Sequence, residues 1–237
     1  MSAAPTALLL PGLNGTGVFY AELENQLDGI ATCTRADLPS DCSQDYETLA
    51  DHLSQSYERD TFDVIIAESF SGPLSVLAIA NDVLCPKALI LGATFVSSPF
   101  RNLPVRPVSD LASAFGMNRF VATTYIQNFL LNSGCELNAG EVYKEVKDLS
   151  AETISSRIQA ATTVDMRAEF AALTLPILVL NAKHDRLIFS LDRKGFAAND
   201  NAEVIWLDAP HFMFQCAARD AARSIQSFLN DKGLLAA

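Results

Sequence analysis

Short apolar runs alternate with amphipathic segments along most of the chain. Six runs have the length of buried β-strands, at residues 6–10, 31–36, 62–67, 87–92, 177–181 and 203–207. Apolar residues recur at helical spacing in the segments between and after them, at residues 19–27, 46–57, 73–84, 191–198 and 213–230. Continuous apolar strands joined by helical crossovers predict an α/β fold. We expect a mostly parallel six-stranded sheet with helices on both faces.

The alternation stops between the fourth and fifth predicted strands. Residues 97–173 show helical periods without a clear strand, and they open with Pro99, Pro104 and Pro107. We therefore expect residues 1–96 and 174–237 to form the core. Residues 97–173 would be a helical cap or lid, inserted over the ends of the strands. Within the core, Ser43 is the expected N-cap of the helix that starts near Tyr46.

Composition places the chain among ordinary globular proteins, with 237 residues, 49% hydrophobic and 19% charged. The formal net charge of −11 disfavours binding to nucleic acid, and also docking on an anionic membrane by charge alone. No run of 18 apolar residues appears, so we expect no membrane span. The first residues lack the basic region of a signal peptide. Oligomeric state has no signature in the sequence.

The cysteines at positions 33, 42, 85, 135 and 216 are scattered, odd in number and without a CxxC pair. This usage suits free thiols in a reducing cytosol better than a disulfide framework or a zinc site. We expect a cytoplasmic protein without a metal or an organic cofactor.

A candidate nucleophile lies in the turn between the third strand and the helix after it. Ser69 stands there between two small residues, Ala67 and Ser71, in a relaxed version of the G-x-S-x-G pattern. Such a turn forces the serine into a strained backbone conformation and projects its hydroxyl above the sheet. Ser71 is the rival nucleophile, although it would put Pro73 where a small residue is needed. Alternatively, Ser69 simply caps the helix.

A serine nucleophile needs a base, and the chain has three histidines. His211 follows the last strand, at the sheet edge where α/β proteins place their sites. His52 belongs to an amphipathic helix, and His184 lies beside the candidate acid.

The orienting acid is expected in the turn after the fifth strand, where Asp185 stands. Asp208, three residues before His211, is its competitor. Ser69, Asp185 and His211 thus follow three separate predicted strands, in the order that a Ser–Asp–His triad requires in one known fold.

Acyl transfer also needs backbone N–H groups that stabilise the developing oxyanion. Phe70, directly after the nucleophile, supplies one candidate. The glycine-rich loop after the first strand supplies the other, which we assign to Leu13 with Asn14 as the alternative. That loop lacks the Lys-Ser/Thr of a phosphate-binding P-loop, so nucleotide binding is disfavoured.

Together these motifs resemble the α/β-hydrolase superfamily over residues 6–96 and 174–231. The motifs are Pro11-Gly12-Leu13-Asn14-Gly15, Ala67-Glu68-Ser69-Phe70-Ser71-Gly72, Lys183-His184-Asp185 and Pro210-His211-Phe212. The resemblance implies Ser69 as nucleophile, Asp185 as acid, His211 as base, and Leu13 and Phe70 as oxyanion donors. The middle block matches the position of the variable cap. The chain departs from the pattern at Pro11, where many members have histidine.

The leading hypothesis is a serine hydrolase that cleaves carboxylic esters of small or medium acyl groups. The motif sequences are also similar to those of acyltransferase-like branches of the superfamily. An acyltransferase or a thioesterase with the same triad is therefore the alternative. A ligand-binding module without turnover is a third possibility. Six aromatic residues in or next to the middle block are candidates for the acyl pocket: Phe95, Phe100, Phe115, Phe120, Tyr125 and Phe129.

Overall fold

Six parallel strands form the single sheet of the structure, a computed structural model that describes residues 3–99, 119–131, 134–188 and 193–235. In chain order they are β1 (Thr6–Leu10), β2 (Thr32–Arg35), β3 (Val64–Glu68), β4 (Ala88–Gly92), β5 (Ile177–Ala182) and β6 (Ala202–Leu207). Their order across the sheet is β2-β1-β3-β4-β5-β6, and every neighbouring pair is parallel. The predicted sheet is confirmed.

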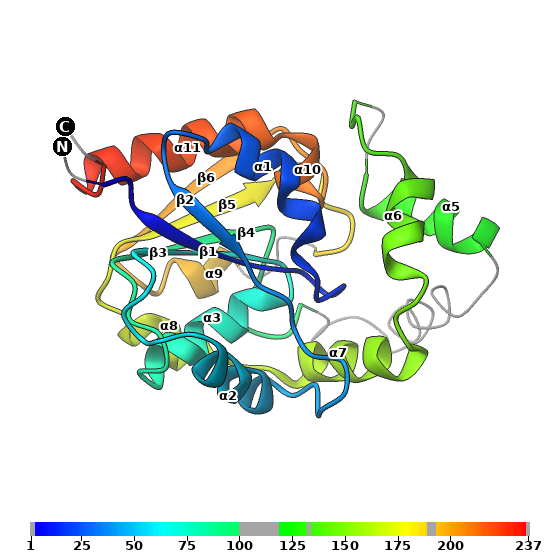
Figure 1. Ribbon diagram of the computed structural model, residues 1–237, viewed down its shortest axis with the longest axis horizontal. Coiled ribbons are helices and arrows are strands. Elements are labelled where there is room, and N and C mark those ends of the chain that lie inside the picture. The colour runs from blue at the N-terminus through cyan, green and yellow to red at the C-terminus, as the bar shows by residue number, and fades with distance from the viewer. Residues whose placement is uncertain (1–2, 100–118, 132–133, 189–192, 236–237) are drawn as a thin grey trace.

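Helices cover both faces of the sheet, as predicted (Figure 1). One face carries the 3-10 helix η1 (Gly17–Tyr20) and the helices α1 (Ala21–Gln26), α10 (Met213–Cys216) and α11 (Ala218–Asp231). The other carries α2 (Tyr46–Ser56), α3 (Ser71–Ala80), α8 (Arg167–Ala172) and α9 (Arg193–Phe196). Successive residues of a strand point to opposite faces, so Leu8 and Leu9 of β1 belong to different hydrophobic clusters.

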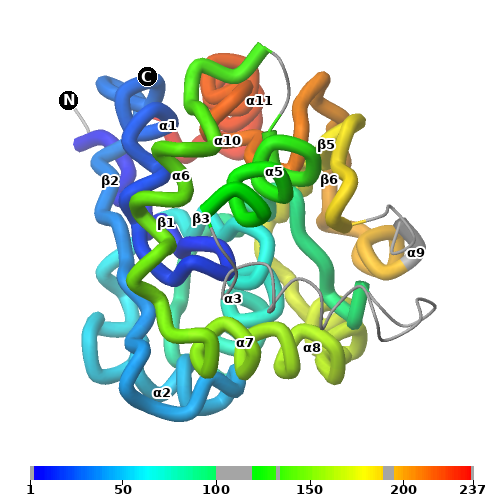
Figure 2. Tube along the Cα trace, turned by 90° about the vertical axis from the view of Figure 1, so that its right-hand side faces the viewer, coloured from blue at the N-terminus to red at the C-terminus, as the bar shows by residue number. Residues whose placement is uncertain are grey.

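The block between β4 and β5 is helical, with α5 (Arg119–Phe129), α6 (Ala139–Val146), α7 (Ala151–Thr163) and α8. Helices α5 and α6 lie beyond the carboxyl ends of the strands (Figures 1 and 2). They share a small apolar cluster that includes Ile126 and Val142. In contrast, Phe170 of α8 is buried in the core cluster beside α3. The boundary of a cap at residues 97–173 stays a prediction.

Helix starts follow ordinary capping chemistry, with one correction. The helix α2 is capped by Asp45, whose Oδ1 accepts the Thr48 N–H at 2.7 Å, and not by Ser43 as expected. The Ser43 hydroxyl instead donates to the Asp45 carboxylate. A carboxylate at this position satisfies a free helical N–H and also interacts favourably with the helix dipole.

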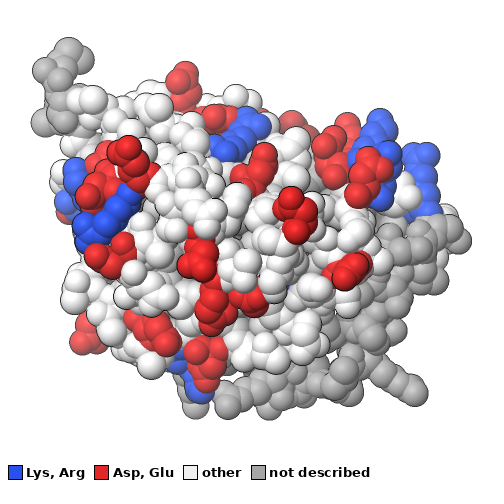
Figure 3. Space-filling model, turned by 60° about the horizontal axis from the view of Figure 1, so that its bottom comes forward, with Lys and Arg blue, Asp and Glu red and all other residues white. Residues whose placement is uncertain are grey.

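The surface agrees with the acidic composition. On the face in Figure 3, Asp and Glu side chains predominate over Lys and Arg. Across the described ranges of the chain, no helix has the length and apolar character needed to cross a membrane.

Candidate active site

The turn between β3 and α3 has the strained geometry expected at Ser69. Ser69 has φ of +49°, in the left-handed region that is unfavourable for a residue with a Cβ atom. Its N–H donates to the Gly92 carbonyl at 3.0 Å, which joins the turn to β4. A Cβ atom at Gly72 would lie 1.9 Å from Thr94 Oγ1, so glycine is required at this position. The turn can therefore approach the neighbouring strand closely enough to hold its strained residue.

The hydroxyl of Ser71, the rival nucleophile, is already engaged in a hydrogen bond. The Ser71 side chain is completely buried, and its hydroxyl donates to the Pro11 carbonyl. This bond ties the turn at Ser69 to the glycine-rich loop after β1. The position of Ser71 therefore supports a structural role.

The structure brings Ser69, His211 and Asp185 together from three separate loops. His211 Nε2 lies 3.1 Å from Ser69 Oγ, and His211 Nδ1 lies 2.8 Å from Asp185 Oδ2. The other Asp185 oxygen, Oδ1, accepts the N–H groups of Leu187 and Ile188, each at 2.8 Å. These two bonds fix the carboxylate, which in turn fixes the imidazole. All three side chains are buried.

The remaining histidines lie apart from this relay. His184 Nε2 lies 2.6 Å from Asp208 Oδ1, so the two competing candidates pair with each other at the surface. His52 lies on α2, with its Nε2 atom 3.3 Å from Ser56 Oγ. Neither histidine lines the cavity above Ser69. The geometry supports His211 as the partner of Ser69.

Glu68, next to Ser69, is a second buried carboxyl group that the sequence analysis did not single out. Burial raises its pKa to about 7, against the opposing effects of the His211 charge and a hydrogen bond from Gln215. Gln215 Nε2 donates to Glu68 Oε2 at 3.2 Å. For His211, burial lowers the pKa. The Asp185 charge and hydrogen bond and the Glu68 charge outweigh burial, so the pKa of His211 lies above its ordinary value.

This electrostatic arrangement predicts the pH dependence of any reaction in which His211 accepts a proton. The imidazole must be neutral, so kcat/KM should rise with pH through a value above about 6.5. In Glu68→Gln a negative charge near His211 is absent, and the midpoint of this rise should move to lower pH. A pH profile of kcat/KM measures this midpoint in wild type and in Glu68→Gln. The matched control is Glu22→Gln, at an exposed position on α1. An unmoved midpoint in Glu68→Gln would contradict the coupling.

The glycine-rich loop after β1 lies beside Ser69. A Cβ atom at Gly12 would be 3.7 Å from the Ser69 Cβ atom, and Gly12, Leu13 and Asn14 line the same cavity as Ser69. Within the part of the chain that the structure describes, the N–H groups of Leu13 and Phe70 donate to no protein acceptor. Both N–H groups are thus available to a ligand, and their role as oxyanion donors stays a prediction.

A small cavity of about 60 Å³ lies at Ser69 and is partly open to solvent. Its polar lining residues are Asn14, Glu68, Ser69, Tyr125 and His211. Apolar side chains make up most of its walls, at Leu130, Val142, Val146, Leu149, Ile154, Leu187 and Phe212. The helical block between β4 and β5 supplies five of these seven. Such a cavity suits an apolar group attached to a polar reacting centre.

The structure places the aromatic residues that were expected to line this cavity in different environments. Tyr125 lines it, whereas Phe95 is buried in the core cluster beneath the sheet. Phe120 is 78% exposed and Phe129 38% exposed, and both line a shallow outer surface of α5. Phe95, Phe120 and Phe129 are therefore absent from the lining of this cavity, where aliphatic side chains predominate, and a role for them in substrate binding stays a prediction. Phe100 and Phe115 lie outside the described residues.

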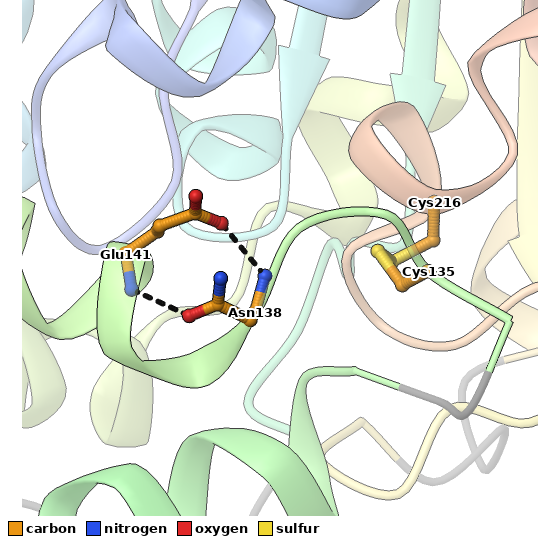
Figure 4. Close-up of a disulfide and its surroundings, with 4 residues drawn as sticks. All are labelled: Cys135, Asn138, Glu141 and Cys216. Atoms are coloured by element: carbon orange, nitrogen blue, oxygen red, sulfur yellow. Dashed lines mark hydrogen bonds between the residues drawn. A yellow bond between two sulfur atoms is a disulfide. The ribbon is translucent and has the colours of Figure 1, made fainter.

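A disulfide between Cys135 and Cys216 joins the loop before α6 to the end of α10 (Figure 4). The expectation of five free thiols is wrong at these two positions, which are 81 residues apart in sequence. The disulfide ties the helical block to the segment that follows His211. The cysteine usage is therefore no longer an argument for a reducing compartment, and the cytoplasmic location stays a prediction.

Cys135→Ser should lower thermal stability. A link that closes a loop of this length restricts the unfolded chain, and its loss should cost about 2–4 kcal/mol, or roughly 5–10 °C in Tm. Differential scanning calorimetry measures this, with the exposed free thiol variant Cys85→Ser as control. Alkylation of the unfolded, unreduced protein should modify three thiols. Modification of all five would contradict the disulfide.

Within residues 3–99, 119–131, 134–188 and 193–235, no group of three or more His, Cys, Asp or Glu side chains could hold a metal ion. The described groups of the site are a strained serine, a histidine and carboxylate relay, two backbone N–H groups without a protein acceptor and a largely apolar cavity.

No family model matches this sequence, and no curated protein matches it. Solved structures do match its fold. A bromoperoxidase from Bacillus anthracis superposes with a TM-score of 0.81 at 13% identity, covering 97% of this chain and 93% of that chain. An enol-lactonase from Burkholderia xenovorans LB400 gives 0.78 at 20% identity, with 97% and 92% covered. An esterase from Exiguobacterium antarcticum gives 0.79 at 14% identity, with 97% and 93% covered.

These structures share the α/β-hydrolase fold, and the likeness shows that this chain has the same fold. The resemblance drawn from the sequence motifs is thereby confirmed for the fold. A fold alone supports many chemistries, so the activity must be argued from the site.

Proposed function

We propose that this protein with an α/β-hydrolase fold is a serine hydrolase that cleaves carboxylic esters of small or medium acyl groups through an acyl-enzyme. The observation that carries the proposal is the buried relay from Asp185 through His211 to the strained Ser69, at 2.8 Å and 3.1 Å. It opens into an apolar cavity. The neighbours of this fold include an esterase and an enol-lactonase, which supports an enzyme of the hydrolase class.

In the proposed mechanism, Ser69 Oγ attacks the ester carbonyl carbon while His211 Nε2 takes the hydroxyl proton. The carbonyl oxygen becomes an oxyanion and accepts hydrogen bonds from the Leu13 and Phe70 N–H groups. The bond to the alkoxy group then breaks, and His211 returns the proton to the leaving alcohol. A water molecule, deprotonated by His211, attacks the acyl-enzyme. Collapse of this second tetrahedral intermediate releases the carboxylic acid and restores Ser69.

The apolar walls of the cavity are the proposed acyl site. In this proposal residues 97–173 act as a cap, because the helical block between β4 and β5 supplies most of the apolar residues that line the cavity. The proposed substrate is a small-molecule ester whose small or medium acyl group lies along these apolar walls. Asp185 keeps the proton of the neutral imidazole on Nδ1, so that Nε2 is free to accept the serine proton.

Intact-mass spectrometry after treatment with a fluorophosphonate probe tests the nucleophile. Wild type should gain one adduct that is absent in Ser69→Ala and present in the surface control Ser224→Ala. Turnover of p-nitrophenyl acetate, butyrate and octanoate by wild type should accompany it, and the chain-length preference would size the acyl site. An adduct with no hydrolysis, or with more product when an alcohol acceptor is added, would favour binding or acyl transfer. No adduct on folded protein would overturn the proposal.

A further inference from the structure

Arg157 of α7 is a fully buried arginine that makes hydrogen bonds to neutral groups. Its Nε donates to Gln44 Oε1 at 2.8 Å, Nη1 to the Leu13 carbonyl at 2.9 Å and Nη2 to the Pro39 carbonyl at 3.0 Å. Its exposed fraction is 0%. Across the described residues, no Asp or Glu forms an ion pair with it. A buried charge is costly when no ion pair compensates it, which makes an ordinary packing role a poor explanation.

The guanidinium lies directly against the glycine-rich loop. Gly15 has φ of +75° and donates its N–H to the Gly12 carbonyl at 3.0 Å, which closes a tight turn. A Cβ atom at Gly15 would lie 2.1 Å from Arg157 Nη1. The loop and the arginine therefore fit each other, since any side chain at position 15 would displace the guanidinium.

Arg157 connects three parts of the chain at this point. It joins α7 to the loop after β1 through Leu13, and to the segment between β2 and α2 through Pro39 and Gln44. The Leu13 carbonyl accepts a hydrogen bond from the guanidinium. The same loop lines the cavity over Ser69 through residues 12–14. The loop is also held by its own turn, by the Ser71 hydroxyl on the Pro11 carbonyl, and by two bonds to the segment after β2, from Leu38 N–H to the Gly15 carbonyl at 2.7 Å and from Gly17 N–H to Asp37 Oδ1 at 2.9 Å. Among these bonds, the one from Arg157 is made to the Leu13 carbonyl itself.

We infer that Arg157 is a positioning residue for the oxyanion site: it fixes the Leu13 carbonyl, and with it the peptide unit between Leu13 and Asn14, and so restricts the backbone of Leu13, whose N–H is the proposed donor to the substrate oxygen. The buried positive charge behind the loop further favours negative charge on that oxygen. Burial lowers the pKa of Arg157 to about 10, so the group is still charged at neutral pH. This inference rests on the proposed function, because it assigns Arg157 to the same ester-cleaving site.

Arg157→Met and Arg157→Lys separate the two contributions. Arg157→Met removes charge and hydrogen bonds, and its kcat should fall about 30–100-fold, somewhat less than the loss of a direct oxyanion donor. Arg157→Lys keeps the charge but loses the planar guanidinium and its fixed set of N–H donors, and its kcat should fall about 10-fold. KM should change less than about threefold in both, since the acyl wall is untouched. The matched control is Arg223→Met, on the exposed surface of α11.

The measurement is kcat per active site with a p-nitrophenyl ester that wild type turns over, where fluorophosphonate labelling counts the reactive Ser69. This quantity does not fall when part of the sample is merely unfolded. The inhibition constant of a trifluoromethyl ketone, which forms an oxyanion on Ser69, should rise by the same factor as kcat/KM falls. Should Arg157→Met not fold, Gln44→Leu replaces it, because it loosens the guanidinium without removing the charge.

A kcat per site within about twofold of wild type in Arg157→Met, or in Gln44→Leu where it is used, would overturn the inference alone. Equal losses in kcat and in 1/KM, with the ketone unaffected, would also overturn it, because they would indicate a changed acyl wall. Wild type that neither labels nor turns over ester would overturn the proposed function, and this inference with it. The two failures are therefore distinct.

Discussion

Ser69→Ala and His211→Ala are each expected to lose about 10⁵–10⁶-fold in kcat with p-nitrophenyl esters. The reason is the single proton path between Ser69 Oγ and His211 Nε2, 3.1 Å apart. Without the hydroxyl there is no nucleophile, and without the imidazole no group in this relay takes the hydroxyl proton. The double variant should be little worse than either single one, because the residues act as a unit.

The matched controls for this pair are His52→Ala on α2 and His184→Ala, whose imidazole pairs with Asp208 at the surface. Both should keep kcat within about twofold of wild type, as surface substitutions usually do. Steady-state kinetics on samples with matching circular dichroism spectra checks all five variants, the double variant included. Full activity in His211→Ala would refute the assignment of the base.

Asp185→Asn is expected to lose about 10⁴-fold in kcat while the protein folds normally. Asp185 Oδ1 already accepts two backbone N–H groups, from Leu187 and Ile188. An asparagine would keep its oxygen on these donors and turn its NH₂ group toward His211 Nδ1. The imidazole would then carry its proton on Nε2, where it cannot accept the proton of Ser69.

The matched control is Asp208→Asn, since Asp208 was the competing acid and is exposed beside His184. Its kcat should stay within about twofold of wild type. Nitrogen NMR of His211 would report the tautomer in each variant. Loss of activity in Asp208→Asn with normal activity in Asp185→Asn would reverse the assignment of the acid.

The sequence predicted the sheet and the positions of the candidate relay because both follow from local pattern. Apolar runs such as residues 64–68 and 88–92 are buried on both faces, and such runs are readable without tertiary information. Ser69, Asp185 and His211 each follow a strand, and the carboxyl ends of parallel strands meet at one edge. Their order along the chain was therefore enough to predict that they lie together.

The lining of the cavity at Ser69 could not be predicted in the same way. Residues such as Phe95 and Phe129 carry the right chemistry, but whether a helix turns a side chain inward depends on what it packs against. Phe95 packs in the core cluster, and Phe129 is partly exposed on α5. The inner wall is aliphatic, with residues such as Val142 and Ile154 that look like any core position in a helical pattern.

By itself, the sequence determined the parallel strands, the strained turn at Ser69 and the order of the relay, because each strand and turn has a local pattern and the carboxyl ends of parallel strands meet at one edge. Tertiary structure alone decided which cysteines pair, since Cys135 and Cys216 are 81 residues apart. It also decided the role of Arg157. That residue shares the apolar face of α7 with Ile154 and Ile158, yet only the folded chain brings it to Leu13, 144 residues away. Long-range contacts of this kind are set by packing, which local pattern does not encode.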